Sequence, residues 1–195
     1  MKKKNYKANI IMVVIISILA IAGVTAAWFL KKNKDNGIGS QYKITALKDN
    51  KLVEDGQDKS CTITIVCDTI LDNLDSLDEE KLPYVPENGE ILPKTTVSFA
   101  DGDTVFEVLQ KVCEATDIQL EYSWTPLYNN YYIEGIGHLY EFDCGAESGW
   151  MFKVNDTFPN YGCSSYNLEG GEDIVWCYTC NGLGEDVGAA VTGEN

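Results

Sequence analysis

Few side chains in this sequence are suited to acid–base or nucleophilic catalysis. His138 is the only histidine among 195 residues, and it stands between Gly137 and Leu139. A Ser/His or Cys/His nucleophile system would have to be built around that ring, and no G-x-S-x-G motif places a nucleophile near it. We therefore expect His138 to be an exposed or hydrogen-bonded loop residue and the protein to act without catalysis.

The segment Cys177-Tyr-Thr-Cys180 has the C-x-x-C spacing of some zinc and redox sites. Thioredoxin-type pairs lie at a helix N-terminus, whereas this pair ends an Ile-Val-Trp run that indicates a strand. On a strand the two side chains point to opposite faces. A structural zinc would need two more ligands, and neither a second C-x-x-C nor a histidine pair is present. We therefore expect no metal and no redox chemistry at this motif.

The seven cysteines as a set leave two interpretations open. Cys61 and Cys67 cannot bridge each other, because six residues of strand span about 20 Å and a disulfide tolerates only about 7 Å between Cα atoms. Disulfides to other partners are expected if the domain is extracellular, and buried free thiols are the alternative. Because seven is odd, at least one thiol is unpaired in a monomer.

An acidic run extends from Asp68 to Glu80. Calcium loops of the EF-hand type need oxygen ligands at fixed spacing around a central glycine. This run instead has leucines between its acids and contains no glycine. We interpret it as the solvated face of a short helix over residues 71–82, not as a metal site.

Aromatic residues indicate a binding surface. Trp150 follows Ser148-Gly149 at the start of a strand, and Tyr161 lies in the segment after a turn at Asn155-Asp156, so a hairpin is expected to bring the two regions together. We predict that at least two of five rings are exposed on one concave surface, as suits a flat ligand. The alternative is that all five are core residues. The five candidate ligand-binding residues are Trp124, Tyr128, Trp150, Phe158 and Tyr161.

The charge is divided unevenly along the chain. The formal net charge is −15, and all 15 basic residues are lysines. Seven of them lie in the first 34 residues, where there is no acid, so residues 35–195 carry 8 − 30 = −22. Nucleic-acid binding requires clustered Lys and Arg. We therefore expect no nucleic-acid partner.

The chain divides into five parts. Residues 1–9 form a basic leader, and residues 10–30 form an apolar run of the length that spans a bilayer as a helix. We interpret this run as a transmembrane anchor or uncleaved signal, with a cleaved signal peptide as the alternative. The leader is then cytoplasmic and the remainder extracellular in a single-pass cell-membrane protein. Residues 31–60 are expected to be a flexible stalk, residues 61–180 the folded domain and residues 181–195 a flexible tail.

Inside the folded domain, strands flank one central helix. Residues 61–67 alternate with a period of two, and residues 95–99 and 174–180 also have strand character. Asp103-Thr104 is an N-cap signal for a helix that continues to about residue 115. This order indicates an α+β fold in which a mixed sheet packs on one helix.

The helix has an inner and an outer face. Phe106 lies on its apolar stripe, so truncating Phe106 is expected to destabilise the domain. Truncating the adjacent Glu107 is expected to have no such effect.

Three segments are distinctive, namely GWMFKVN, the following FPNYGCSSY, and DGDTVFEVL. Through them the sequence resembles the transcobalamin-like C-terminal domain family over residues 61–180. That family is catalogued among domains of unknown function and occurs on surface proteins of Gram-positive bacteria. In vertebrate cobalamin carriers the similar domain has a β-grasp-like fold and covers one face of the corrinoid. The resemblance therefore implies a β-grasp-like mixed sheet and a corrinoid ligand.

Two classes of function follow from these patterns. The first is a membrane-anchored extracellular module that captures a small molecule, such as a corrinoid, for uptake by a nearby transporter. It requires no cofactor. The second is a surface module that contacts proteins or glycans, or serves a structural role, without a small-molecule ligand.

Overall fold

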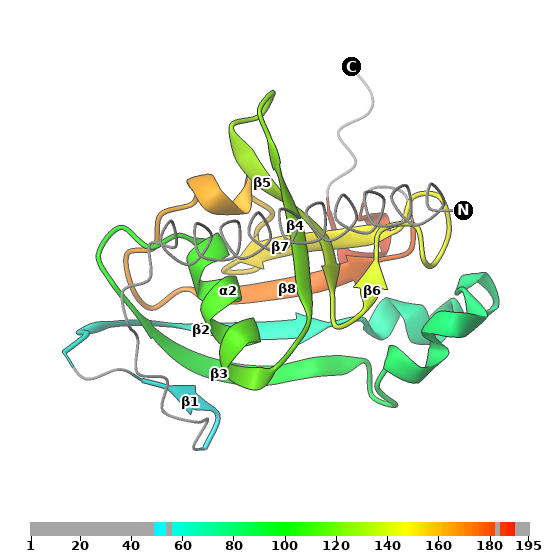
Figure 1. Ribbon diagram of the computed structural model, residues 1–195, viewed down its shortest axis with the longest axis horizontal. Helices are drawn as coiled ribbons and strands as arrows, with labels where there is room; N and C mark the ends of the chain where they lie inside the picture. The colour runs from blue at the N-terminus through cyan, green and yellow to red at the C-terminus, as the bar shows by residue number, and fades with distance from the viewer. Residues whose placement is uncertain (1–48, 54–55, 182–183, 190–195) are drawn as a thin grey trace, which may run out of the picture. The chain divides into compact units, whose positions relative to one another are not determined.

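The structure is a computed structural model that describes residues 49–53, 56–181 and 184–189 (Figure 1). The predicted leader, the apolar segment 10–30, most of the stalk and the end of the tail lie outside these residues. In the described ranges, no helix is long and apolar enough to cross a membrane. All the elements below belong to one unit within residues 43–195.

A five-stranded mixed sheet forms the centre of this unit. Its strands lie in the order β1-β3-β2-β8-β7. The central strand β2 is antiparallel to β3 and parallel to β8, while β8 is antiparallel to β7 and β1 is parallel to β3. The structure thus confirms a mixed sheet in an α+β fold. The strands are β1 (Lys51–Leu52), β2 (Lys59–Val66), β3 (Glu90–Phe99), β7 (Gly149–Val154) and β8 (Asp173–Thr179).

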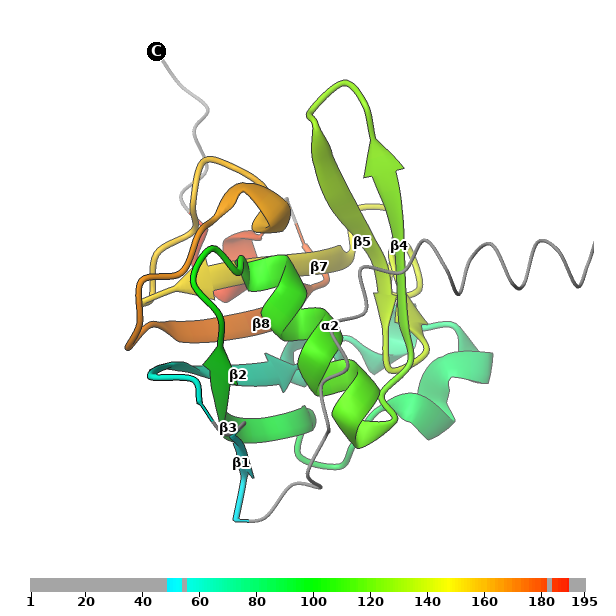
Figure 2. The same cartoon turned by 60° about the vertical axis from the view of Figure 1, so that its left-hand side comes forward.

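The helix α2 (Val105–Thr116) packs on one face of this sheet (Figure 2). Ile63 and Ile65 of β2 are level with Ile174 and Trp176 of β8, and all four side chains are buried. Alternate strand residues and one helix stripe therefore form a single apolar core, as the two periodicities predict. The buried residues of α2 are Val105, Phe106, Val108, Leu109, Val112 and Cys113.

A capping box marks the start of α2. Thr104 is the N-cap, and its backbone N–H donates to Glu107 Oε2 at 2.9 Å. The Thr104 hydroxyl also donates to Glu107, and the N3 backbone N–H is satisfied by the Thr104 side chain in a capping box. Although Glu107 is exposed, it satisfies one of the free N–H groups at the helix start. The prediction that truncating Glu107 does not lower the thermal midpoint sharply stays a prediction, and loss of the cap is expected to have only a small cost.

The segment expected to be a helix over residues 71–82 forms three short 3-10 helices, namely Asp68–Asp72, Leu74–Ser76 and Glu79–Tyr84. Its turns close through bonds such as Ser76 N–H to Asn73 O. The Asn73 amide also donates to Thr69 O at 2.8 Å, which offers the backbone an alternative to helix propagation. Because of these local bonds, the leucine spacing does not produce an α-helix.

The folded unit begins earlier than residue 61. β2 starts at Lys59, and β1 pairs with β3 so that Leu52 lies opposite Val97. Leu52 is 2% exposed. A two-residue strand is too short to produce a periodic signal, so the end of the predicted stalk contains structure that the sequence pattern does not reveal.

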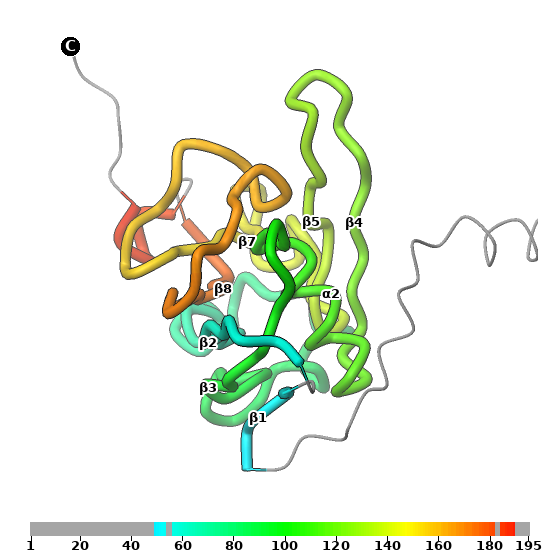
Figure 3. The backbone as a smooth tube through the Cα atoms, turned by 90° about the vertical axis from the view of Figure 1, so that its left-hand side faces the viewer, coloured from blue at the N-terminus to red at the C-terminus, as the bar shows by residue number. Residues whose placement is uncertain are grey.

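A second, three-stranded antiparallel sheet contains β4 (Leu120–Thr125), β5 (Asn130–Ile136) and β6 (Leu139–Tyr140). β4 and β5 form a hairpin that packs beside α2, and its tip extends beyond the helix and the larger sheet (Figure 3). The four middle residues of β4 are exposed, whereas β5 alternates between buried and more accessible positions. The hairpin thus has one strand that contributes little to the core.

The seven cysteines are all described, and all are free thiols. The expected disulfide framework is therefore not formed in this structure. Cys61, Cys67 and Cys113 belong to the apolar core, where desolvation raises the pKa of each thiol to about 12. These three behave as small apolar residues.

Candidate ligand-binding site

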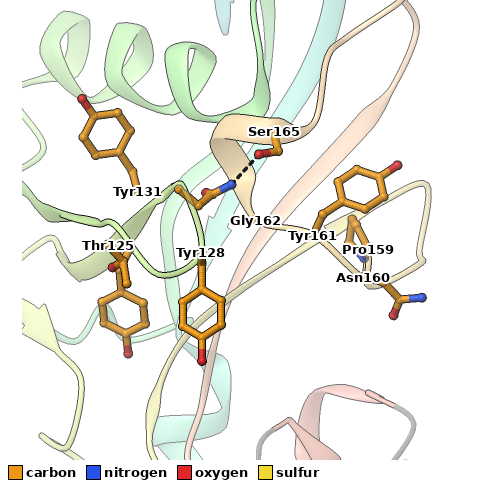
Figure 4. A pocket seen from close by; sticks show the side chains of 10 residues that line it. Thr125, Tyr128, Tyr131, Pro159, Asn160, Tyr161, Gly162 and Ser165 are labelled. Carbon is orange, nitrogen blue, oxygen red and sulfur yellow. Dashed lines mark hydrogen bonds between the residues drawn. The ribbon is translucent and has the colours of Figure 1, made fainter.

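A cavity of about 500 Å³ lies between the tip of the β4–β5 hairpin and the segment 159–165 (Figure 4). The hairpin turn forms one wall, because Tyr128 N–H bonds to Thr125 O at 3.2 Å and Asn129 adopts a φ of 48°. The returning segment forms the other wall. The lining residues are Thr125, Tyr128, Asn130, Tyr131, Tyr132, Pro159, Asn160, Tyr161, Gly162 and Ser165.

Asn130 joins the two walls. It is buried at 6% exposure, its amide Nδ2 donates to Ser165 Oγ at 2.7 Å, and its Oδ1 accepts from the Ser164 N–H at 3.2 Å. The Ser164 hydroxyl in turn accepts from the Tyr131 N–H at 3.1 Å. Because a buried amide with these partners is costly to displace, the first residues of β5 hold the returning segment in place.

Gly162 allows this close approach. A Cβ atom at position 162 would lie 2.3 Å from Asn130 Cγ and Oδ1. Real Cβ contacts are essentially never that short, so any larger residue must displace Asn130 or the chain. The adjacent Cys163 is buried, and its thiol donates to Tyr131 O at 3.6 Å. The shape of the cavity therefore requires glycine at position 162.

Tyr128 and Tyr161 are the two predicted residues that the structure brings together on this cavity. Tyr128 is 75% exposed in the hairpin turn, and Tyr161 is 56% exposed on the returning segment. Figure 4 shows the two rings projecting from the separate walls. Tyr161 also stacks on Tyr166 with 5.6 Å between ring centroids. Two accessible rings thus share one concave surface, and their role in binding stays a prediction.

The other three predicted residues do not line this cavity. Trp124 is 47% exposed on β4 and packs edge-on against Tyr131. Trp150 is buried in the core and donates its indole N–H to Leu139 O at 2.8 Å. Phe158 is half-buried, with Lys153 Nζ 5.2 Å from its ring centroid.

The strand pairing explains why Trp150 and Tyr161 do not meet. The expected hairpin between them does not form, because β7 pairs with β8 and not with the segment that follows it. The turn at Asn155-Asp156 is present, with positive φ at both residues, but only one bridge, between Val154 and Thr157, continues it. The chain then leaves the sheet toward the β4–β5 hairpin.

The cavity walls are uncharged. Every lining side chain is aromatic, amide, hydroxyl, proline or glycine. At the rim, Tyr132 donates its hydroxyl to Glu141 Oε2 at 2.6 Å. Desolvation, with help from this carboxylate, raises the pKa of Tyr132 to about 12, so the phenol stays neutral at physiological pH. This lining suits an uncharged ligand with flat surfaces and a few polar groups.

A second hollow of about 520 Å³ lies on the other side of Tyr161. It shares Tyr161 and Ser165 with the first cavity and adds two carboxylates, Glu169 and Glu172. Glu172 is 8% exposed and accepts from the backbone N–H groups of Glu169 and Gly170. Its carboxylate therefore closes a local turn and is engaged within the protein.

Besides the aromatic Tyr131 and Tyr132, the five candidates omit several cavity residues that are not aromatic. Asn130, Gly162 and Ser165 shape the walls, although none stood out as aromatic or charged. Gly162 and Ser165 do belong to the FPNYGCSSY motif, which was the most specific part of the sequence resemblance. That motif was the sequence signal by which these two residues could have been identified. No local signal pointed to Asn130, because its hydrogen-bond partner Ser165 is 35 residues away.

No nucleophile with a base adjoins this cavity among the residues that line it. His138 lies elsewhere, 4.6 Å from Tyr84 between ring centroids. Across the described ranges, no group of three His, Cys, Asp or Glu residues is arranged to hold a metal ion.

Comparison with known families places part of the chain. Residues 102–180 match the family described as Domain of unknown function (DUF4430). This stretch contains α2, both walls of the cavity and β8. It also lies within residues 61–180, over which the sequence resembles the transcobalamin-like C-terminal domain family. No curated protein matches the chain.

Among solved structures, the chain is similar to haptocorrin in complex with Cbi, with 15% identity and a TM-score of 0.46. The similarity covers 62% of this chain and 25% of the haptocorrin chain. A second similar structure is a candidate metal binding protein from Ruminococcus gnavus, with 11% identity and a TM-score of 0.38. That match covers 63% of this chain and 97% of the other.

Proposed function

We propose that this protein is a membrane-anchored extracellular module that binds a small molecule on an uncharged surface, and that the ligand is a corrinoid. The ligand lies against Tyr128 and Tyr161 in the cavity between the hairpin tip and the segment 159–165. The module binds without catalysis and presents its ligand to a nearby transporter. The five-stranded sheet and α2 serve as the β-grasp-like scaffold of that surface.

The observation that carries this proposal is the pair of accessible tyrosines on one uncharged cavity. A volume of about 500 Å³ falls within the range of about 300–1,000 Å³ that is usual for small-molecule pockets. Exposed aromatic rings on a soluble surface favour a partner, because monomers seldom leave such rings clustered. An unrelated role in core stability does not account for rings that remain more than half exposed.

The hydrogen bonds between the cavity walls indicate a binding site that is already formed before the ligand arrives. The Asn130 amide connects both walls through bonds of 2.7 and 3.2 Å, so the tyrosines need little rearrangement on binding. A surface that is already ordered loses less conformational entropy when a ligand arrives. Planar amide-rich macrocycles gain from such rings and from amide and hydroxyl partners. A corrinoid has this chemistry.

The membrane anchor is proposed from the apolar run 10–30 and the basic leader before it. The acidic domain then lies outside the cell. Protease added to intact cells should release the folded unit. Protection of that unit until the cells are lysed would contradict this orientation.

The ligand is tested with the full-length chain in detergent micelles, titrated with cobinamide, cobalamin and a panel of neutral oligosaccharides. Heat and the visible corrinoid spectrum are the readouts. We expect saturable corrinoid binding, and a loss of about tenfold in affinity for Tyr161→Ala, which is about 1.4 kcal/mol. Tyr84→Ala is the matched control, since Tyr84 is 45% exposed and lies outside the cavity.

Three results would contradict the proposal. If neither corrinoid binds, the proposed ligand is wrong. If Tyr161→Ala and the parent chain bind a corrinoid with equal affinity, the proposed site is wrong. Binding of an oligosaccharide that Tyr161→Ala weakens would keep the site and replace the ligand class by glycans.

A further inference from the structure

Two of the seven free thiols, Cys144 and Cys180, lie close to each other near the end of β8. Cys144 lies in the loop between β6 and β7, and Cys180 directly follows β8. Their side chains lie within hydrogen-bonding reach of each other. Cys144 is 1% exposed, whereas Cys180 is half-buried. This pair therefore combines one shielded sulfur with one that solvent reaches.

The same short helix holds both sulfurs in position. The Cys144 thiol donates to Asn73 O at 3.5 Å, and the Cys180 thiol donates to Thr69 Oγ1 at 3.6 Å. Thr69 and Asn73 are themselves joined by the bond from Asn73 Nδ2 to Thr69 O. Three separate parts of the chain thus converge on one point.

The backbones of both cysteines are also fixed. Cys144 N–H donates to Ser148 Oγ at 3.1 Å, and Cys180 N–H donates to Asp186 Oδ2 at 2.8 Å. Ser148 is further bonded to the Tyr178 hydroxyl at 2.9 Å. A disulfide requires specific Cα and Cβ positions, so anchored backbones around touching thiols favour its formation.

The remaining cysteines are directed elsewhere. Cys177 donates to Met151 O at 3.7 Å, on the other face of β8 from its neighbour Tyr178, and Cys163 donates to Tyr131 O at 3.6 Å. Cys61, Cys67 and Cys113 are buried in the apolar core. The C-x-x-C pair of the sequence is accordingly split, and Cys180 faces Cys144 instead of Cys177.

We propose that Cys144 and Cys180 are an oxidisable pair, which closes to a disulfide by exchange with a small-molecule or protein disulfide. Cys180, the more accessible sulfur, attacks the donor as thiolate, forming a mixed disulfide and releasing one thiolate of the donor. Cys144 then attacks the Cys180 sulfur and releases the second. The two cysteine protons end on the donor, which is reduced by two electrons to two thiols.

The Cys144–Cys180 disulfide would be a structural bond and not a rapidly exchanging redox pair. Burial raises the pKa of the Cys180 thiol to about 12 and raises that of Cys144, so the reactive thiolates are scarce at neutral pH. Closure is then slow. The link would join the loop that carries Ser148 to the end of β8, and it would restrain the 3-10 segment that packs between them.

The test uses the full-length chain, reduced and then incubated with oxidised glutathione. Free thiols are alkylated under denaturing conditions, and the chain is cut with a glutamate-specific protease. Cleavage after Glu141 and Glu147 isolates Cys144 in peptide 142–147, and cleavage after Glu172 and Glu185 leaves Cys177 and Cys180 together in peptide 173–185. Mass spectrometry then finds any pair of linked peptides.

We expect peptide 142–147 linked to peptide 173–185 in the parent chain and in Cys177→Ser. The link should be absent in Cys180→Ser. We also expect the thermal midpoint of Cys177→Ser to rise on oxidation by about 10 °C, because the link closes a loop of more than thirty residues. An internal link within peptide 173–185, links to any other cysteine, or complete alkylation of peptide 142–147 would each overturn the proposal.

Discussion

The five-stranded sheet with α2 and the β4–β5 hairpin use the same aromatic residue types in opposite ways. In the first region, Trp176 and Tyr178 on β8 are 2% and 0% exposed. In the second, Trp124 and Tyr128 are 47% and 75% exposed. Residue type alone therefore does not decide between core and surface in this protein. Strand position does, because β8 has neighbours on both sides whereas β4 pairs only with β5 in the described sheets.

Phe106 is the point where the two regions meet. Its ring on α2 stacks on Tyr131 of β5 with 4.3 Å between centroids, and it meets Tyr122 of β4 edge-on at 4.9 Å. Tyr131 in turn contacts Trp124. The hairpin is thus attached to the core through aromatic contacts, which offset-stacked and edge-to-face geometries stabilise. Exposed rings near the cavity are therefore supported by more deeply buried ones.

Phe106→Ala should destabilise the protein more than any other single change considered. Removing this ring leaves a cavity in the core and withdraws the support of Tyr131, and such truncations cost about 3–5 kcal/mol of unfolding free energy. Chemical denaturation of the full-length chain measures it. Glu114→Ala, on the exposed face of the same helix, is the control and should change little. Similar small effects for both would mean that the core does not extend to the hairpin.

Gly162→Ala should have the next largest effect, and it acts on the hairpin side. The added methyl group overlaps Asn130, so we expect a cost of about 1–3 kcal/mol and a measurable loss of corrinoid affinity. Gly149→Ala is the control, because its Cβ meets nothing nearer than 3.6 Å. If Gly162→Ala is as stable as the parent and binds equally well, Asn130 does not fix the cavity walls.

Much of the fold followed from local patterns. The alternation of Cys61, Ile63 and Ile65 identified a half-buried strand, and Asp103-Thr104 before Phe106 identified the start of α2. These signals are reliable because period and capping are set by bonds within one element. The 3-10 segment from residue 68 to residue 84 was not predictable in this way, since its form depends on local hydrogen bonds that compete with a helix.

The candidate site was predictable only in part. Tyr128 and Tyr161 could be chosen because aromatic residues in loops are a local signal. The Asn130–Ser165 bond could not, since it joins positions 35 residues apart and needs the three-dimensional arrangement. The strand partner of β7 was also a long-range choice, and the wrong partner placed Trp150 on the surface. Local sequence patterns thus identify candidate residue types, while strand register decides which of them face the cavity.

A smaller effect is expected for Glu107→Ala. This change removes the reciprocal bond to the Thr104 N–H and should cost about 1 kcal/mol, as loss of a helix cap does. Glu107→Gln retains an acceptor and should recover part of the loss. Denaturant midpoints of the two variants measure the difference. A cost as small as that of Glu114→Ala would mean that the capping box contributes nothing to the stability of the core region.

Tyr128→Ala should change stability least. It tests most directly whether the exposed rings of the hairpin differ in role from the buried rings of the larger sheet. A ring that is 75% exposed has few contacts to lose, so the free energy of unfolding should stay within about 0.5 kcal/mol of the parent. Corrinoid affinity should nevertheless fall by about tenfold, because this ring forms one wall of the cavity.

Leu127→Ala is the matched control for Tyr128→Ala. Leu127 lies in the same turn and is 82% exposed, but it does not line the cavity. It should leave both stability and affinity unchanged. A loss of stability in Tyr128→Ala comparable to that of Phe106→Ala would make the hairpin tip part of the core. Equal corrinoid affinity in Tyr128→Ala and Leu127→Ala would instead show that the Tyr128 ring does not contribute to binding. Tyr128 would then no longer be assigned to the site.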